Sequence, residues 1–218
     1  TAAQGLAVDN IIDEFGESMN AILRDNVLNV HEDKRTLRMS NIGRKERFLW
    51  YVHKGMAQEQ MKPSTLMKFL YGHATEELVL ALVKLAGHEV THQQAEAQVS
   101  GIKGSMDCVI DGKLIDVKTM GRTSPPKENF VNNLIDLQIN HSADHFIFNS
   151  FNKKNNILTV CGWISKTNFI KLAEYFPKNT TRKRTDGTEF KTFSGLYELQ
   201  NKNLNGVYSP DELLIQLK

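Results

Sequence analysis

The hydrophobic and polar positions of the chain follow two different periods, which separate helical from extended segments. Apolar residues recur every three or four positions between residues 8 and 28 and again between residues 64 and 86. This spacing predicts an amphipathic helix over each range. Residues 104–119 instead alternate apolar and polar side chains around Asp111-Gly112, which predicts a β-hairpin with a tight two-residue turn.

Cap and turn residues mark the ends of these and further segments. Ser64 is the predicted N-cap of the second helix, and Gly87 follows its last apolar residue. The remaining helices are predicted at 41–53 after the N-cap Ser40, at 128–141, from the N-cap Ser165 to Phe176, and after the capping box at 209–212. Two apolar strands are predicted at His145–Ser150 and Ile157–Trp163, and a polar, basic loop at 180–187.

Composition and charge narrow the class of protein. The chain has 218 residues, 40% of them hydrophobic, which is enough to bury a sizeable core. Its formal net charge is only +2, so any surface that attracts nucleic acid has to be local. Cys108 and Cys161 lie in apolar, strand-like segments and are expected to be reduced core residues, which excludes a four-cysteine iron–sulfur cluster. With no apolar run of membrane-spanning length and no visible signal peptide, we expect a soluble, cytoplasmic protein without a membrane partner.

The predicted hairpin carries the most informative group of polar residues. Asp107 and Asp116 lie on its two arms, and Lys118 follows Asp116 on the same face of the strand, while Val117 points to the other face. Two acids and an amine on a rigid hairpin suit metal-assisted attack on a phosphodiester. The alternative is structural: Asp116 and Lys118 would form an ordinary ion pair, and Asp107 would be a solvated strand end. Asp111 is assigned to the turn.

The predicted helix at 64–86 carries two further acids on a largely apolar segment. Glu76 and Glu77 lie among leucine and valine residues, and burying a carboxylate is costly unless it is paired or bound to metal. Glu76 is the first candidate for a metal ligand on this helix, and Glu77 is the second candidate for the same role. The alternative is a solvated helix stripe, which we favour for Glu77. His73 is expected to be structural or exposed.

In this order, the acids resemble the motif of the PD-(D/E)XK nuclease superfamily. Its members carry an acid on one strand and (D/E)-x-K on the next, matched here by Asp107 and by Asp116-Val117-Lys118. The RecB-like and phage-type exonuclease branch adds a G-x-x-x-(H/E) pattern on a preceding helix, and Gly72 with Glu76 is similar to it. The resemblance covers about a fifth of the chain, between Gly72 and Lys118.

The resemblance implies a metal site and roles for its residues. One or two Mg²⁺ or Mn²⁺ ions would be held by Glu76, Asp107, Asp116 and the backbone carbonyl of Val117, since these ions prefer hard oxygen ligands. Glu76, Asp107 and Asp116 would thus take part in catalysis by holding the metal ion. Lys118 would orient or deprotonate the attacking water and stabilise the charged transition state.

The fold expected from the element order agrees with the resemblance. The elements follow one another in the order helices, hairpin, helix, two strands, helix. This order predicts an α/β fold with a mixed central sheet flanked by helices. The resemblance implies a restriction-endonuclease-like core with an N-terminal helical addition. We expect one nuclease domain over 1–218, made of a helical addition at 1–60, a catalytic core at 64–176, and a basic loop with C-terminal packing elements at 177–218.

Several polar and basic residues are candidate contacts to nucleic acid. Ahead of the core, Ser40, Arg47, Trp50 and Tyr51 are similar to a serine and basic-aromatic stretch of RecB-like nucleases. The alternative is a solvated basic face with the aromatic rings turned inward, which we favour for Trp50. The full set of candidates is Ser40, Arg44, Arg47, Arg122, Gln138, Arg182, Lys183 and Arg184. For Gln138 an ordinary polar helix position is favoured, and the basic loop serves either solubility or phosphate binding.

The function expected from these features is hydrolysis of DNA phosphodiester bonds by a metal-dependent deoxyribonuclease. Family likeness favours an exonuclease of DNA recombination, repair or phage DNA processing, acting on single- or double-stranded DNA with ends favoured. The alternatives are a structure- or site-specific endonuclease and a non-catalytic nucleic-acid-binding protein on a nuclease fold. An oligomer stays open, and a viral source would place the protein in the host cytoplasm.

Overall fold

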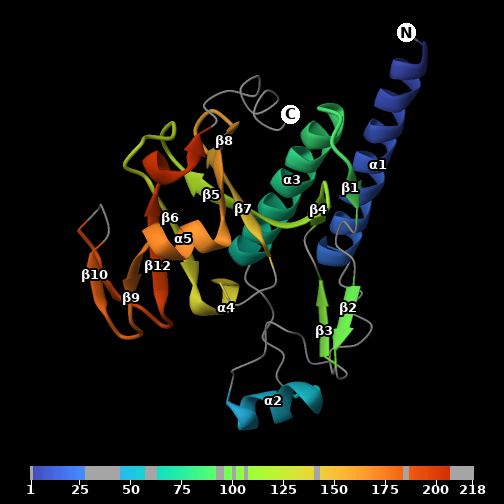
Figure 1. Cartoon of the computed structure of the whole chain (residues 1–218). Helices are drawn as coiled ribbons and strands as arrows, with labels where there is room; N and C mark the ends of the chain where they lie inside the picture. Colours follow the sequence, from blue (N-terminus) through green and yellow to red (C-terminus); the bar gives the residue numbers. More distant parts are fainter. Residues whose placement is uncertain are drawn as a thin grey trace. The chain divides into compact units, whose positions relative to one another are not determined.

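A computed structural model describes residues 2–27, 45–56, 63–91, 96–99, 102–105, 108–139, 143–183 and 187–206 (Figure 1). The chain divides into two compact units, Thr1–Gly112 and Lys113–Lys218, which are described here one at a time. Helices and a mixed set of strands confirm the predicted α/β class. Within the described ranges, no helix has both the length and the apolar character needed to cross a bilayer.

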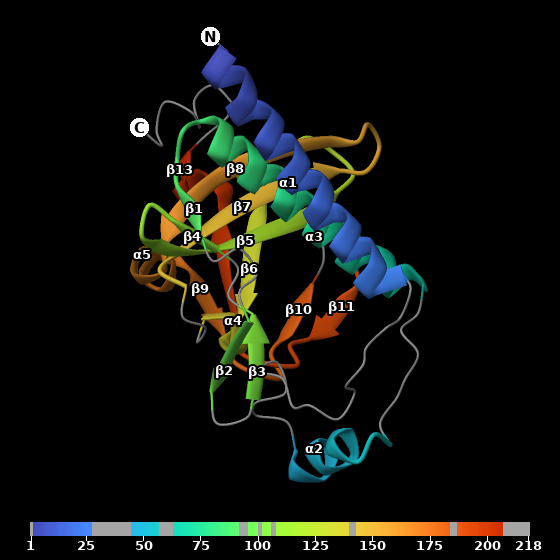
Figure 2. The same ribbon diagram turned by 90° about the vertical axis from the view of Figure 1, so that its right-hand side faces the viewer.

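The first unit is built on two long helices. Helix α1 (Ala2–Val27) lies along α3 (Pro63–Leu85) in both ribbon views (Figure 2), and Glu14 pairs with Lys84 between them at 2.6 Å. Both helices were predicted. The first unit also holds α2 (Glu46–His53), β1 (Val90–Thr91), β2 (Glu96–Val99), β3 (Ile102–Ser105) and β4 (Cys108–Ile110). Strands β1 and β4 pair antiparallel, as do β2 and β3.

The ends of the helices in this unit follow the sequence only in part. Helix α3 begins at Pro63, one residue before the predicted cap Ser64, because proline is well suited to the first helical position. Gly87 follows its end with a φ of 93°, as predicted for a helix C-terminus. Helix α2 begins at Glu46, and its predicted cap Ser40 lies outside the described residues.

The prediction that Trp50 turns inward is wrong. Its side chain is 52% exposed, and no residue of α2 is buried. The Trp50 ring meets the Tyr51 ring edge-on at 5.2 Å, so the aromatic contact is made along the helix itself. A helix of this length, with nothing buried, gives an apolar ring no core to enter.

The predicted hairpin turn is present at Asp111-Gly112, between β4 and β5 (Lys113–Arg122). Asp111 has a φ of 48° and Gly112 a φ of 78°, and positive values at both central residues define the type I′ hairpin turn. The Asp111 carboxylate accepts a hydrogen bond from the Glu89 amide at 3.1 Å and contacts His88 Nδ1 at 2.5 Å. Asp111 is therefore a turn residue, as its sequence context predicts.

The second unit is organised around a mixed sheet in the order β5, β7 (His145–Asn152), β8 (Ile157–Ser165), β13 (Asn205–Gly206). Strands β5 and β7 run parallel, whereas β7 pairs antiparallel with β8 and β8 with β13. The two apolar strands predicted after residue 144 are both confirmed, and each is longer than predicted. Gly162, with a φ of 144°, lets β13 approach, since a Cβ there would lie 2.6 Å from the Asn205 carbonyl oxygen.

A second, three-stranded sheet replaces part of a predicted helix. Its order is β6 (Val131–Ile135), β12 (Leu196–Gln200), β9 (Glu174–Phe176). The prediction of a helix over 128–141 is wrong, because residues 131–135 pair with β12 and only α4 (Asp136–Ile139) is helical. Asparagines at 132 and 133 are poor helix formers, and Asn132 donates a buried hydrogen bond to Asn201 Oδ1 at 2.7 Å.

The helix predicted after Ser165 begins correctly and ends early. Ser165 Oγ accepts a hydrogen bond from the Asn168 amide at 3.3 Å, which confirms the cap of α5 (Lys166–Leu172). The predicted continuation to Phe176 is wrong, because residues 174–176 pair with β12.

Part of the predicted basic loop is likewise a strand: β10 (Thr181–Lys183) pairs with β11 (Glu189–Lys191). A short 3₁₀ helix, η2, covers Asn201–Asn203, and the capping box at 209–212 lies outside the described residues.

Three phenylalanine rings form the centre of the core in this unit. Phe146 and Phe148 on β7 and Phe169 on α5 are fully buried, and the Phe169 centroid lies 5.6 Å and 5.7 Å from the other two. Leu134 and Leu199 extend this core into the three-stranded sheet. The mixed sheet and the three-stranded sheet are thus held together by apolar packing.

Replacing the central ring tests this packing. Phe169→Ala is expected to lower the free energy of unfolding by about 3–5 kcal/mol, because it removes buried apolar surface and leaves a cavity. Phe193→Ala is the matched control, since Phe193 is 75% exposed and its loss should change stability by less than about 0.5 kcal/mol. Urea unfolding of both variants measures the difference, and equal stabilities would contradict the assigned core.

The two cysteines offer a test in solution. Cys108 and Cys161 are buried and outside any disulfide, as predicted. Burial raises the pKa of the Cys161 thiol to about 11, although the nearby Arg122 guanidinium opposes the shift. Because the thiol stays protonated below that pH, we expect iodoacetamide at pH 8 to leave Cys161 unmodified in the native protein and to alkylate it in urea. Mass spectrometry measures both states, and rapid native alkylation would contradict the assignment.

Candidate active site

Strand β5 presents the predicted Asp-x-Lys sequence as a buried ion pair. Lys118 Nζ lies 2.6 Å from Asp116 Oδ1, so the two side chains share a face of the strand, as their spacing predicts. Asp116 is 3% exposed, and Val117, on the opposite face, is 7% exposed. The parallel neighbour β7 places Phe146 beside Asp116 and Phe148 beside Lys118. The charged pair therefore lies at the border of the phenylalanine core.

The pair is asymmetric in its access to water. The side chain of Lys118 is 25% exposed and that of Asp116 only 5%, so the amine reaches solvent while the carboxylate is held inside. Asp116 Oδ1 is buried and, among the described residues, accepts no hydrogen bond of regular geometry. Its contact with Lys118 is thus one of charge. A buried carboxylate oxygen whose lone pairs accept no regular hydrogen bond suits a hard divalent cation, which fits the role that the resemblance implies for Asp116.

Ser150 is a nearby polar residue that sequence reasoning missed. Ser150 lies on β7, two positions beyond Phe148, and is paired with Met120 of β5. Because Met120 is two positions beyond Lys118, Ser150 faces the same side of the sheet as Lys118. Its side chain is 3% exposed, and its hydroxyl has no hydrogen-bond partner among the described residues. The signal in the sequence was a serine within an apolar strand, where a buried hydroxyl needs a polar neighbour.

Glu76 lies on α3 of the first unit and is 9% exposed, which agrees with a carboxylate that is not solvated. His73 Nδ1 lies 4.0 Å from Glu76 Oε2. Burial lowers the pKa of the His73 imidazole below its ordinary value, so the ring favours its neutral form. His73, which was expected to be structural or exposed, is half-buried.

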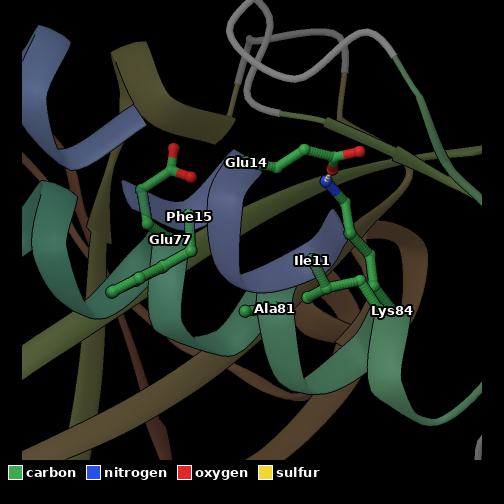
Figure 3. Close-up of a pocket in the computed structure, with 6 residues that line it drawn as sticks. All are labelled: Ile11, Glu14, Phe15, Glu77, Ala81 and Lys84. Atoms are coloured by element: carbon green, nitrogen blue, oxygen red, sulfur yellow. Dashed lines mark hydrogen bonds and ion pairs between the residues drawn. The ribbon is translucent and has the colours of Figure 1, made fainter. Parts of the chain in front are cut away.

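The prediction that favoured Glu77 as part of a solvated stripe is wrong. Glu77 is 3% exposed, and with Phe15 and Ala81 it lines a small pocket between α1 and α3 (Figure 3). Glu14 and Lys84, which form an ion pair, also line the pocket. The long helix α1 covers the face of α3 that the sequence pattern alone left open to water.

The remaining acid, Asp107, lies outside the described residues. Among the residues that the structure does describe, no three His, Cys, Asp or Glu side chains are grouped as they would be around a metal ion. Asp116 and Lys118 are therefore the part of the predicted site that is brought together. The ligand set of Glu76, Asp107, Asp116 and the Val117 carbonyl stays a prediction.

The side chains of Arg122 and Gln138, both candidate nucleic-acid contacts, are engaged within the protein. Arg122 donates a hydrogen bond to the Val131 carbonyl at 2.5 Å and stacks over the Phe130 ring. Burial lowers its pKa below the ordinary value. Gln138 Oε1 accepts a hydrogen bond from the Ile135 amide at 3.0 Å, so its side chain stabilises the junction of β6 and α4. For Gln138 this contact agrees with the structural alternative favoured from the sequence.

Of the other candidate nucleic-acid contacts, three lie outside the described residues and three lie within them. Ser40, Arg44 and Arg184 lie outside the described residues. Arg47 is exposed on α2, where its guanidinium lies 3.4 Å from the Tyr51 hydroxyl. Arg182 pairs with Glu198 and stacks on Phe176, while Lys183 is exposed on β10.

No protein-family model matches the chain, and no curated protein or solved structure is significantly similar to it. The likeness to the PD-(D/E)XK superfamily thus rests on the motif residues and their order. The structure adds the α/β class, the hairpin turn and the pairing of Asp116 with Lys118.

A double-mutant cycle tests whether the pair acts as a unit. Asp116→Asn and Lys118→Met should each lower stability, because each leaves one charge without its partner. The double variant should lose less than the sum of the singles, by about 1–3 kcal/mol. Urea unfolding supplies the four free energies. Additivity of the two single effects would show that the two groups do not interact in solution.

Proposed function

We propose that the protein is a Mg²⁺- or Mn²⁺-dependent deoxyribonuclease. The observation that carries the proposal is the buried Asp116 carboxylate, held 2.6 Å from the Lys118 ammonium on β5. A buried ion pair is weak evidence for stability, because well-packed apolar residues of similar volume often serve as well. A carboxylate retained at such a place, next to an amine that reaches solvent, is typical of a functional site.

The proposed roles follow from the surroundings of each group. Asp116 supplies a fixed oxygen ligand, and Glu76, Asp107 and the Val117 carbonyl supply the others, as the motif implies. When bound, the metal ion would polarise the phosphate and increase the acidity of its water. Lys118, being partly exposed, can reach the attacking water to orient or deprotonate it, and its positive charge stabilises the charged transition state. Its contact with Asp116 fixes the direction of the flexible side chain.

The substrate and the mode of cleavage rest on the likeness of the motif to RecB-like and phage-type enzymes. DNA is the proposed substrate, and cleavage from ends is proposed over internal cleavage. Recombination, repair or phage DNA processing is the corresponding proposed setting.

Cleavage of linear and closed circular DNA, with Mn²⁺ or with a chelator, tests the proposal. Wild-type protein should shorten linear DNA progressively in Mn²⁺, leave closed circles intact, and be inactive with chelator. Lys118→Ala should lose at least about 100-fold in turnover, in line with the loss of a positioned acid–base group, while metal and DNA binding persist. Asp116→Ala should lose turnover and also bind Mn²⁺ more weakly, as calorimetry would measure.

Lys113→Ala is the matched control, because Lys113 is an exposed lysine at the start of the same strand. It should cleave DNA at the wild-type rate. If wild type and Asp116→Ala cleave DNA equally and without metal, the proposed metal-dependent site is ruled out. Cleavage of closed circles would instead indicate an endonuclease, and Mn²⁺-independent DNA binding without cleavage a binding protein.

A further inference from the structure

The hairpin of β10 and β11 has two faces of different character. Its register pairs Arg182 with Phe190, and Thr181 with Lys191. Because side chains alternate along a strand, Arg182 and Phe190 share the inner face, while Thr181 and Lys191 lie on the outer face. The two faces can therefore serve different purposes.

The inner face is anchored to the three-stranded sheet. Arg182 Nη2 lies 2.5 Å from Glu198 Oε2 on β12, and the guanidinium carbon lies 3.7 Å from the centroid of the Phe176 ring on β9. An arginine that is both paired and stacked holds the hairpin in place. Its charge is used inside the protein, so Arg182 is not the cation that this hairpin offers to a partner.

Hydrogen bonds beyond β11 hold Thr192, the residue that precedes Phe193. The Thr192 amide donates to the Thr180 carbonyl at 3.0 Å, and the Asn179 amide to the Thr192 carbonyl at 2.8 Å. Thr192 is buried, and its hydroxyl donates to the Pro177 carbonyl at 2.7 Å. Phe193 follows in a bend, two residues beyond Lys191, where β11 ends.

An exposed aromatic ring lies two residues along the chain from Lys191, a lysine of the outer face. Phe193 is 75% exposed, more than any other large apolar side chain in the described ranges. Lys191 lies opposite Thr181, whereas Lys183 lies directly opposite Glu189, which offsets part of its charge. Lys191 is thus the lysine of this face whose charge has no acidic residue across the ladder.

We propose that the outer face of this hairpin, with Lys183 and Lys191, and the adjoining Phe193 together bind single-stranded nucleic acid. Phe193 stacks on an unpaired base, and Lys191 contacts the adjoining phosphate, with Lys183 contributing less. An anchored hairpin presents both groups without a large loss of freedom on binding. A stacked duplex hides the faces of its bases, so a protruding ring favours a single strand over a duplex. The choice of nucleic acid as partner rests on the proposed nuclease function.

Fluorescence anisotropy of a labelled oligothymidylate, measured in chelator, tests binding without cleavage. Phe193→Ala should weaken binding about ten-fold, and Phe193→Trp should retain it, as expected for base stacking. Lys191→Ala should make the dependence of log affinity on log salt shallower by about 0.7, the value for one phosphate contact on a single strand. Lys183→Ala should have a smaller effect, and Lys202→Ala, an exposed lysine on η2, none.

The outcomes separate this inference from the nuclease itself. Wild-type affinity in both Phe193→Ala and Lys191→Ala would overturn the binding face, even if wild-type protein cleaves DNA. Loss of binding in these variants would support it, even if no cleavage is found. Binding that is stronger for duplex than for single strands would overturn it, as would Phe193-dependent binding to anionic vesicles without binding to oligothymidylate.

Discussion

The arrangement of the second unit depends on one costly interaction, the burial of a carboxylate on its first strand. Asp116 is tolerated inside because Lys118 lies 2.6 Å away and carries its compensating charge toward solvent. The neighbouring positions on β7 are fully buried phenylalanines, so the pair has a low-dielectric wall on one side. A charge placed against such a wall acts more strongly on a bound group than it would in water.

Parallel pairing of β5 and β7 gives this pair its fixed position. The ladder runs over the whole of β7, from His145 opposite Ile115 to Asn152 opposite Arg122. Phe146 and Phe148 then pack on Phe169, which α5 brings from the end of β8. The same core that stabilises the sheet also limits the side-chain freedom of Asp116. Stability and the proposed chemistry therefore depend on the same strand.

The sequence predicted those features that are decided by neighbouring residues. The turn at Asp111-Gly112, the cap at Ser165 and the spacing of Asp116 and Lys118 all depend on a few adjacent positions. The three-stranded sheet was missed because β6 finds its partner β12 far along the chain, and a run such as Val131–Ile135 is ambiguous without that partner. Glu77 was misassigned for the same reason, since its burial depends on the distant helix α1. Asp107 lies outside the described residues, so the complete acid set is known from the sequence alone.

The distance along the chain between β6 and β12 has a consequence for biosynthesis. Leu134 leaves the ribosome long before Leu199, yet both belong to one apolar core. Until residues 196–200 emerge, β6 lacks the strand on which its backbone pairs, and part of the phenylalanine core lacks its cover. The nascent second unit therefore passes through a period of exposed apolar surface, in which a holding chaperone would bind it most readily.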